Sequence, residues 1–531
     1  MLKDGKIWAA RSERDLMLLP NMANRHGLIA GATGTGKTIT MKVLAESFSA
    51  LGVPVFLADV KGDLSGMCVQ GARSESVDRR ASALGMDAFE MKAFPTRFWD
   101  VFGERGVPAR ITVSDIGPVL LARLLKLTDV QAGVLNIAFR AADDQGLLLL
   151  DLKDLRAMLA YVSDNRQEYT ALYGNVSTAS VGAIQRALLA FEEEDGQMLF
   201  GEPALDIRDW MRTDIDGRGY INILNAARLI RNPTTYSTFL LWMLTELFER
   251  LPEVGDPEKP RLVFFFDEAH LLFVDAPKAL VQKIAQVVRL IRSKGVGVYF
   301  VTQCPSDIPD DVLSQLSNRI QHALRAYTPA EQKSIRATAQ AFRANPAFDT
   351  EKALMELGVG EALVSFLDAQ GVPEIVERAL ILPPQSRMGA AEDETVQRII
   401  RTDEFDIKYR EAVDRESAYE ILTRAAEALA RQEDAEEAPV NSAKSDRERL
   451  MEKSAASGKK RGQGIGVFER AATNAASSVA RSVSTNLVNS VLGGRRASAG
   501  TIAKRAATNA LSSVMRSGST SLIRGLFGNK K

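Results

Sequence analysis

Eight residues near the start of the chain have the types and spacing of a phosphate-binding loop. They read GATGTGKT and are Gly31, Ala32, Thr33, Gly34, Thr35, Gly36, Lys37 and Thr38. The octet fits G-x-x-x-x-G-K-[ST], follows an apolar run and opens a helical stretch, which is the context that this motif requires. Main-chain N–H groups would surround the phosphates, Lys37 would reach the β- and γ-phosphates, and the Thr38 hydroxyl oxygen would bind Mg²⁺. The octet therefore predicts a site for ATP and Mg²⁺.

Two acids follow the apolar run in RLVFFFDEAHLLF, residues 261–273. Beside a phosphate-binding loop, Asp267 is expected to hold the Mg²⁺ shell, and Glu268 is expected to polarise the attacking water as a general base. Two ordinary carboxylates at a strand end would give the same letters. His270 comes two residues later, where a histidine more often packs or hydrogen-bonds than catalyses.

A further apolar run with a polar end, YFVTQCPSDIP, contributes Gln303. A strand-end amide near the γ-phosphate can sense it or orient water, and it can also simply cap the strand. Downstream, QLSNRIQHALRAYTP contains Arg319 and Arg325. An arginine at the γ-phosphate is worth ~10³–10⁵ in rate, whereas a surface ion pair uses the same residue type. Each arginine is a candidate for the one that a neighbouring subunit supplies.

The stretch LADVKGDLSG places Asp59, Lys61 and Asp63 directly after another predicted strand. Ligand-facing loops gather at this end of the strands in open α/β sheets. A solvated turn has the same composition, so both interpretations stay open.

These groups need a sheet that brings several strand ends to one edge. Short apolar runs predict strands at 27–30, 54–59, 220–224, 261–267 and 297–303. Helix-like stretches follow most of them, and this alternation predicts an α/β fold with a mostly buried parallel sheet. Residues 361–382 predict a hairpin around Gly371, which Pro383 and Pro384 terminate.

The chain is predicted to have five parts. Between 114 and 212 apolar residues recur at helical spacing, which predicts an all-helical insertion into the sheet domain. The parts are 1–113, the first part of the nucleotide-binding core; 114–212, the insertion; 213–387, the second part of the core; 388–465, a helix and charged linker; and 466–531, a basic tail.

The net charge of zero hides a basic tail. Residues 451–531 contain 14 Lys and Arg against two acids, a formal charge of +12. RAATNAASSVARSVSTNL (470–487) repeats as RAATNALSSVMRSGSTSL (505–522), which predicts two similar amphipathic helices. Such a tail could self-associate or dock a protein partner, bind nucleic acid, lie on an anionic membrane, or stay solvated.

Composition points to the cytoplasm. The two cysteines, Cys68 and Cys304, form no metal-ligand pattern, and so few thiols suggest a reducing compartment. We find no signal-peptide core and no run of about 18 apolar residues, so no transmembrane segment is predicted.

The motifs, taken in order, resemble a known family. GATGTGKT, DVKGD, FFFDEAH, VTQCPSDIP and NRIQHALRAYTP, spread over roughly residues 10–385, are similar to the HerA-like branch of the HerA/FtsK ATPases. The resemblance implies a RecA-like P-loop NTPase that hydrolyses ATP with Mg²⁺ as a hexameric ring translocating double-stranded DNA. The matching positions imply Lys37 and Thr38 for ATP and Mg²⁺, Asp267 and Glu268 for metal and water, Gln303 as sensor, and Arg319 or Arg325 as the finger acting in trans.

The sequence departs from that family at its start. HerA proper has an N-terminal β-barrel that organises the ring and docks a nuclease, whereas only about 26 residues precede the first predicted core strand here. RNA helicases share the letters DEAH, but neither an S-A-T after them nor a Q-x-x-x-R-x-G-R motif is present. The alternative function is a nucleotide-switched scaffold whose basic tail recruits a partner without translocation.

Overall fold

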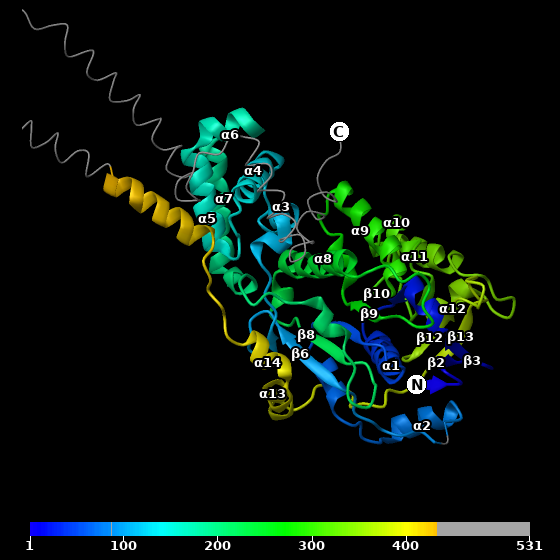
Figure 1. Cartoon of the computed structure of the whole chain (residues 1–531). Coiled ribbons are helices and arrows are strands. Elements are labelled where there is room, and N and C mark those ends of the chain that lie inside the picture. The colour runs from blue at the N-terminus through cyan, green and yellow to red at the C-terminus, as the bar shows by residue number, and fades with distance from the viewer. Residues whose placement is uncertain (87, 433–531) are drawn as a thin grey trace, which may run out of the picture. The chain divides into compact units, whose positions relative to one another are not determined.

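The computed structural model describes residues 1–86 and 88–432 (Figure 1). Within them the chain forms two compact units, the first from residues 1–132 and 187–414 and the second from residues 133–186 and 415–432. The predicted tail repeats and most of the predicted linker lie outside the described residues.

The first unit is built on a single sheet of 13 strands. Their order is β1-β2-β13-β12-β11-β4-β10-β9-β5-β8-β6-β7, with β3 paired to β2. The strands are β1 (Leu2–Lys3), β2 (Lys6–Arg11), β3 (Asp15–Leu18), β4 (Gly27–Ala30), β5 (Val55–Asp59), β6 (Thr96–Asp100), β7 (Val107–Pro108), β8 (Ile221–Asn225), β9 (Leu262–Phe266), β10 (Val296–Thr302), β11 (Asn318–Gln321), β12 (Glu361–Ser365) and β13 (Glu377–Ile381).

The strands from β7 to β11 are all parallel, and the remaining pairs are antiparallel. The predicted α/β class with a parallel central sheet is confirmed, and the five predicted strands appear as β4, β5, β8, β9 and β10. The predicted hairpin appears as the antiparallel pair β12 and β13. Strands β1–β3 were not predicted, and they fill the short segment before β4.

Helices cover both faces of the sheet and connect its parallel strands. In the first unit they are α1 (Lys37–Ala50), α2 (Glu75–Ala83), α3 (Val113–Leu124), α8 (Pro233–Arg250), α9 (Lys278–Ile291), α10 (Asp310–Leu313), α11 (Pro329–Gln340), α12 (Thr350–Glu356), α13 (Asp393–Thr402) and α14 (Glu404–Tyr409). None of the helices described is long and apolar enough to cross a membrane.

The second unit is helical in its described part. It contains α5 (Leu152–Asp164), α6 (Arg166–Tyr173) and a helix over 418–432, while α4 (Asp129–Gln145) and α7 (Thr178–Glu193) contain the boundaries between the units. The buried Asp154 carboxylate accepts hydrogen bonds from the N–H groups of Leu150 and Tyr419, at 2.8 and 2.9 Å, which ties the helix after 417 to α5. The boundaries predicted at 114 and 212 stay a prediction.

Strand β9 shows why the sheet is buried on both faces. Val263 and Phe265 pack in a cluster that includes residues of α1, whereas Phe264 and Phe266, which alternate with them, point to the opposite face of the sheet. Phe264 stacks on Phe56 of β5 with ring centroids 4.6 Å apart. Each buried phenylalanine contributes ~1.5–3 kcal/mol, so the apolar run fixes β9 in the middle of the sheet and its acids at the edge.

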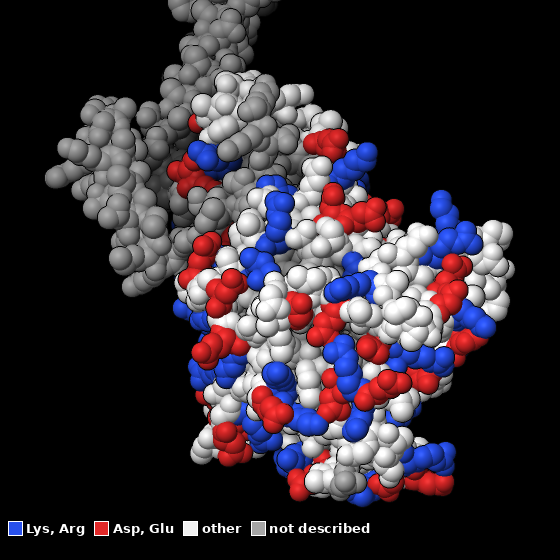
Figure 2. All heavy atoms as spheres, turned by 90° about the vertical axis from the view of Figure 1, so that its right-hand side faces the viewer, with Lys and Arg blue, Asp and Glu red and all other residues white. Residues whose placement is uncertain are grey.

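The antiparallel edge of the sheet carries paired charges. Figure 2 shows acidic and basic side chains interspersed over this face. Arg14 bonds Glu374 at 2.8 Å and Glu377 at 3.4 Å, and Arg378 on β13 bonds Glu361 on β12 at 2.9 Å. Exposed pairs of this kind contribute little to stability, and each neutralises the charges of its own members.

Candidate nucleotide site

The carboxyl ends of four neighbouring strands, β4, β10, β9 and β5, bring the predicted groups to one edge of the sheet. The phosphate-loop octet follows β4, and Gln303 follows β10, which lies between β4 and β9. Asp267 follows β9, and Asp59 ends β5 next to it. The edge of an open α/β sheet at which parallel strands end is where ligands bind. The topology thus places these residues at the same edge, although Gln303 comes 272 residues after Gly31 in the sequence.

The octet forms a loop whose backbone carbonyls accept hydrogen bonds from its own lysine, Lys37. Its residues 31–36 connect β4 to α1, and Lys37 is the first residue of that helix. The Lys37 ammonium donates to the carbonyl oxygens of Gly31 at 2.5 Å and Ala32 at 3.1 Å. Burial lowers the pKa of Lys37, while the charges of Glu268 and Asp267 oppose that shift. A desolvated cation bonded only to neutral carbonyls at a helix N-terminus is suited to receive a phosphate.

The buried His322 supports the loop from the neighbouring strand. It follows β11, its N–H donates to the Ala30 carbonyl at 2.7 Å, and its Nε2 lies 2.8 Å from the Thr40 hydroxyl. Its Nδ1 lies 2.9 Å from the Glu361 carbonyl oxygen. The backbone at Gly31 has φ +152°, and a Cβ there would lie 2.5 Å from the Cβ of His322. His322 belongs to the motif NRIQHALRAYTP, but its residue type and position in the sequence predicted no role for it.

The turn before β12 hydrogen-bonds to the phosphate-binding loop. The Gly360 N–H donates to the Thr35 carbonyl at 3.0 Å. Arg80 on α2 donates in turn to the carbonyls of Gly360 at 3.0 Å and Val359 at 3.1 Å. The two segments that contact this turn lie 279 to 325 residues before it in sequence, and no local pattern predicts these contacts.

The two acids after β9 occupy different environments. The Asp267 carboxylate accepts the Glu268 N–H at 2.9 Å, and its backbone carbonyl accepts the hydroxyl of buried Tyr236 at 2.8 Å. Burial first, and the Glu268 charge second, raise the pKa of Asp267 to about 7. A carboxylate so destabilised gains from a bound divalent cation.

Glu268 is held in an unusual backbone conformation. Its φ is +48° and its ψ is 44°, a left-handed geometry that costs a non-glycine residue about 1–3 kcal/mol. Its carboxylate lies 3.4 Å from Nδ1 of His270. His270 thus lies beside the acid that was predicted to activate water.

Asp59 organises its own loop. Its carboxylate accepts the N–H groups of Gly62 at 2.7 Å and Leu64 at 3.0 Å. Burial, and then the charge of Asp63, raise its pKa to about 6. Lys61 is exposed and acts electrostatically on both Lys37 and Asp267, so this loop faces the same edge.

The remaining predicted residues, Gln303, Arg319 and Arg325, differ in their exposure to solvent. Gln303 is exposed and follows β10 directly. Arg319 is half-buried in β11, and its guanidinium donates to the carbonyls of Leu316 at 3.2 Å and of Leu313 and Ala341 at 3.5 Å. Arg325 is exposed and donates to the Met355 carbonyl at 2.8 Å.

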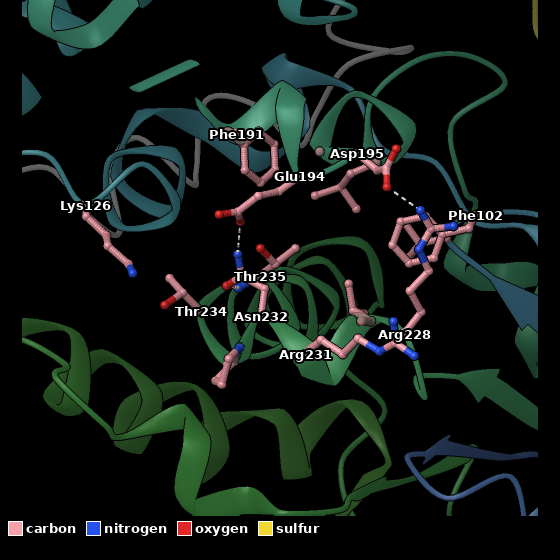
Figure 3. A pocket seen from close by; sticks show the side chains of 15 residues that line it. Phe102, Lys126, Phe191, Glu194, Asp195, Arg228, Arg231, Asn232, Thr234 and Thr235 are labelled. Atoms are coloured by element: carbon pink, nitrogen blue, oxygen red, sulfur yellow. Dashed lines mark hydrogen bonds and ion pairs between the residues drawn. The ribbon is translucent and has the colours of Figure 1, made fainter. Parts of the chain in front are cut away.

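A separate cavity of about 580 Å³ lies at the start of α8 (Figure 3). Asn232 caps the helix by accepting the Thr235 N–H at 3.2 Å, and it donates to Glu194 at 2.7 Å. Exposed Lys126 and Arg231 line the cavity, and within the described residues neither has an acidic partner. Sequence reasoning did not single out this cavity.

The family model and the curated relatives that match this chain all carry the name HerA. A family model described as "Helicase HerA-like C-terminal" matches residues 4–529. The DNA double-strand break repair helicase HerA of Sulfolobus acidocaldarius is 22% identical over 367 residues, which are 68% of this chain and 66% of the relative. The protein of the same name from Sulfurisphaera tokodaii is 22% identical over 366 residues, 66% of this chain and 64% of the relative. The chain thus spans about two thirds of the length of these curated relatives.

Two solved structures are also similar. The bacterial conjugative coupling protein TrwBdeltaN70 is 15% identical with a TM-score of 0.46, covering 71% of this chain and 89% of that one. VirB4 of Thermoanaerobacter pseudethanolicus is 15% identical with a TM-score of 0.45, covering 74% of this chain and 99% of that one.

Proposed function

Because this chain belongs to the family described as helicase HerA-like C-terminal, we propose that it is an ATP-hydrolysing motor that uses Mg²⁺. The observation that carries the proposal is the meeting of the phosphate loop, Asp267 and Glu268 at one edge of the sheet. Lys37 would exchange its two carbonyl partners for the phosphates. Thr38 and Asp267 would hold Mg²⁺, which neutralises charge on the phosphates, and Glu268 would accept a proton from water.

Two substitutions test this assignment. Glu268→Gln should lower phosphate release by about 10²–10⁴-fold while leaving ATP bound, because the base is lost and the phosphate contacts stay. Lys37→Ala should weaken ATP binding itself. Binding of a fluorescent ATP analogue and phosphate release should be measured on the same preparations. Exposed Glu253→Gln is the matched control. Normal hydrolysis by Glu268→Gln would refute the site.

We further propose that the motor acts on double-stranded DNA. The cations at the cavity of α8 support this, because Lys126 and Arg231 are exposed and have no acidic partner among the described residues. Duplex DNA should stimulate ATP hydrolysis at low salt, and the double variant Lys126→Ala, Arg231→Ala should lose stimulation and flatten its salt dependence. Arg14→Ala, from the charge-paired edge, should behave like the wild type. No stimulation by DNA would favour the nucleotide-switched scaffold instead.

Assembly as a hexameric ring is the finer part of the proposal. Each of the two finger candidates donates to three carbonyls of its own chain, and Arg325 is the better placed because it is exposed whereas Arg319 is half-buried. If a neighbour supplies Arg325, mixing inactive Arg325→Ala and Lys37→Ala proteins should restore part of the activity. Light scattering should give a hexamer with ATP. A monomer with and without nucleotide would contradict the ring.

A further inference from the structure

The turn that carries Glu268 needs support from outside the turn itself. Glu268 has φ +48° and ψ 44°, and a short helix, Ala269–Leu272, follows it directly. Within the turn, the Leu271 N–H donates to the Glu268 carbonyl at 3.0 Å. A non-glycine residue in the left-handed conformation persists only where the surrounding contacts over-determine it. Such contacts are therefore expected on both sides of Glu268.

Tyr236 fixes the peptide group that precedes Glu268. This tyrosine lies at the start of α8, is 0% exposed, and donates its hydroxyl to the Asp267 backbone carbonyl at 2.8 Å. The N–H of the same peptide group belongs to Glu268 and donates to the Asp267 carboxylate at 2.9 Å. Because the peptide group is planar, these two bonds fix the orientation of the backbone that enters Glu268.

Arg123, near the end of α3, holds the far end of the turn. Its guanidinium donates to the Leu272 carbonyl at 3.1 Å and to the Ser237 hydroxyl at 3.4 Å. Burial lowers the pKa of Arg123, while the charge of Asp275 opposes that shift. The Nη1 atom of Arg123 is buried and has no hydrogen bond within the described residues. An unsatisfied nitrogen on a buried cation costs stability, so the carbonyl that it holds explains the position of Arg123 better than stability does.

Both residues lie close in sequence to the wall of the cavity at the start of α8. Thr235 directly precedes Tyr236, and Lys126 follows Arg123 by three residues; Thr235 and Lys126 both line that cavity (Figure 3). We propose that Arg123 and Tyr236 are positioning residues that hold Glu268 in its turn and connect it to the cavity, so that DNA bound there raises the rate of hydrolysis. This inference rests on the proposed function, because it gives these two residues a part in the reaction assigned to Glu268.

Two substitutions in the full-length protein remove one contact each. Tyr236→Phe loses the bond to Asp267, and Arg123→Met loses the bond to Leu272. Each should lower kcat for ATP hydrolysis by about 5- to 150-fold, the population change to which the strain of a left-handed turn corresponds. KM for ATP should change little, because the lost contacts are to the turn after β9 and not to the phosphate-binding loop. Duplex DNA should no longer stimulate hydrolysis by either variant, while the affinity for DNA is unchanged.

The matched controls are Tyr299→Phe and Arg110→Met. The buried Tyr299 donates its hydroxyl to the Ala23 carbonyl at 3.1 Å, and the half-buried Arg110 donates to the Tyr409 carbonyl at 2.8 Å. Each control loses the same kind of bond elsewhere in the first unit. The kcat of both controls and their stimulation by DNA should therefore match those of the wild type.

Unfolding in urea separates positioning from a purely structural role. Arg123→Met removes a cation whose Nη1 is buried without a hydrogen bond in the described part of the chain, so its urea midpoint should equal or exceed that of the wild type. Arg123→Lys keeps a donor for the Leu272 carbonyl and should recover part of kcat.

The possible failures are distinguishable. The inference is overturned if Tyr236→Phe and Arg123→Met keep the kcat of the wild type, if DNA stimulates them as it does the wild type, or if kcat and the urea midpoint of Arg123→Met fall together. The proposed ATP hydrolysis survives all three results. It fails instead if the wild type does not hydrolyse ATP or if Glu268→Gln hydrolyses it normally. A wild type that DNA does not stimulate refutes the connection to the cavity together with the proposed action on DNA.

Discussion

Replacing His322 by asparagine tests whether the phosphate loop depends on a neutral imidazole. His322 is 0% exposed and lies between the Thr40 hydroxyl at 2.8 Å and the Glu361 carbonyl at 2.9 Å. Burial is the chief cause that lowers its pKa from 6.5 to about 4. The unfolded chain thus takes up this proton at a higher pH than the folded chain does.

The sign and size of the effect follow from that difference. Because the unfolded state binds more protons, neutral His322 contributes stability that is complete well above pH 6.5 and is lost as the pH falls toward about 4. The full difference is about 3 kcal/mol, and about 2 kcal/mol of it is lost by about pH 5. His322→Asn does not titrate, so the advantage of the wild type over the variant should shrink by about 2 kcal/mol between about pH 8 and pH 5.

Urea unfolding followed by tryptophan fluorescence measures this difference. All four tryptophans, Trp8, Trp99, Trp210 and Trp242, belong to the first unit, so the signal reports the unit that contains His322. Buried carboxyls titrate in both proteins, and their contributions cancel in the comparison.

A second histidine provides a parallel test. His26 is buried, its pKa is also lowered to about 4, and its Nδ1 accepts the Val298 N–H at 3.0 Å, which requires the neutral ring. His26→Asn should remove a similar part of the acid sensitivity. If wild type and His322→Asn lose stability in parallel on acidification, or if NMR places the His322 pKa near its ordinary value, the burial argument is wrong.

Two further predictions concern the loop and the sheet. Gly31→Ala should abolish binding of a fluorescent ATP analogue, because the added Cβ would lie 2.5 Å from the Cβ of His322. Gly34→Ala is the control: a Cβ there would have no atom within 4 Å, so the substitution should cost only the ~1–2 kcal/mol of an alanine in the left-handed conformation. Equal binding of the analogue by the two variants would contradict the steric reason. Arg97→Ala should lower the free energy of unfolding by about 3–5 kcal/mol, because it removes the counter-charge that lies 3.3 Å from the Asp403 carboxylate, which is 5% exposed and keeps only the Phe405 N–H. Exposed Arg79→Ala should change little, and similar urea midpoints for the two variants would refute this.

Much of the parallel sheet could be predicted because its strands are buried on both faces. Runs such as RLVFFFD are apolar without alternation, and their ends carry the acids. Strands β1 and β3 escaped prediction because they have only two and four residues, and β2 because its buried apolar centre, residues 7–10, is short and lies between charged residues. β11 escaped as well, because its sequence NRIQ has one clearly apolar residue and owes its place to pairing with β4.

The site was predictable where chemistry fixes residue types in a local pattern, and not where distant segments meet. The GATGTGKT octet and Asp267 are local patterns. The contacts of His322 and Gly360 with the loop depend on strand register and on turns far along the chain. Arg319 has the residue type of an arginine finger, but on β11 its side chain lines a cavity. The alternation of side chains along β11 decides this orientation, and the residue type does not.

The position of β4 between β10 and β11 has a consequence during synthesis. The phosphate loop emerges early, yet its supporting partner His322 comes about 285 residues after Lys37. At ~5–20 residues per second, a ribosome needs about 15–60 s to make that stretch. Until β10 is made near the end of this interval, the nascent loop has neither of its flanking strands, so we expect a growing chain to hold nucleotide poorly. ATP binding is thereby expected only after β11 is made, and β4 stays an unpaired strand longer than β5, whose neighbours β8 and β9 are made earlier.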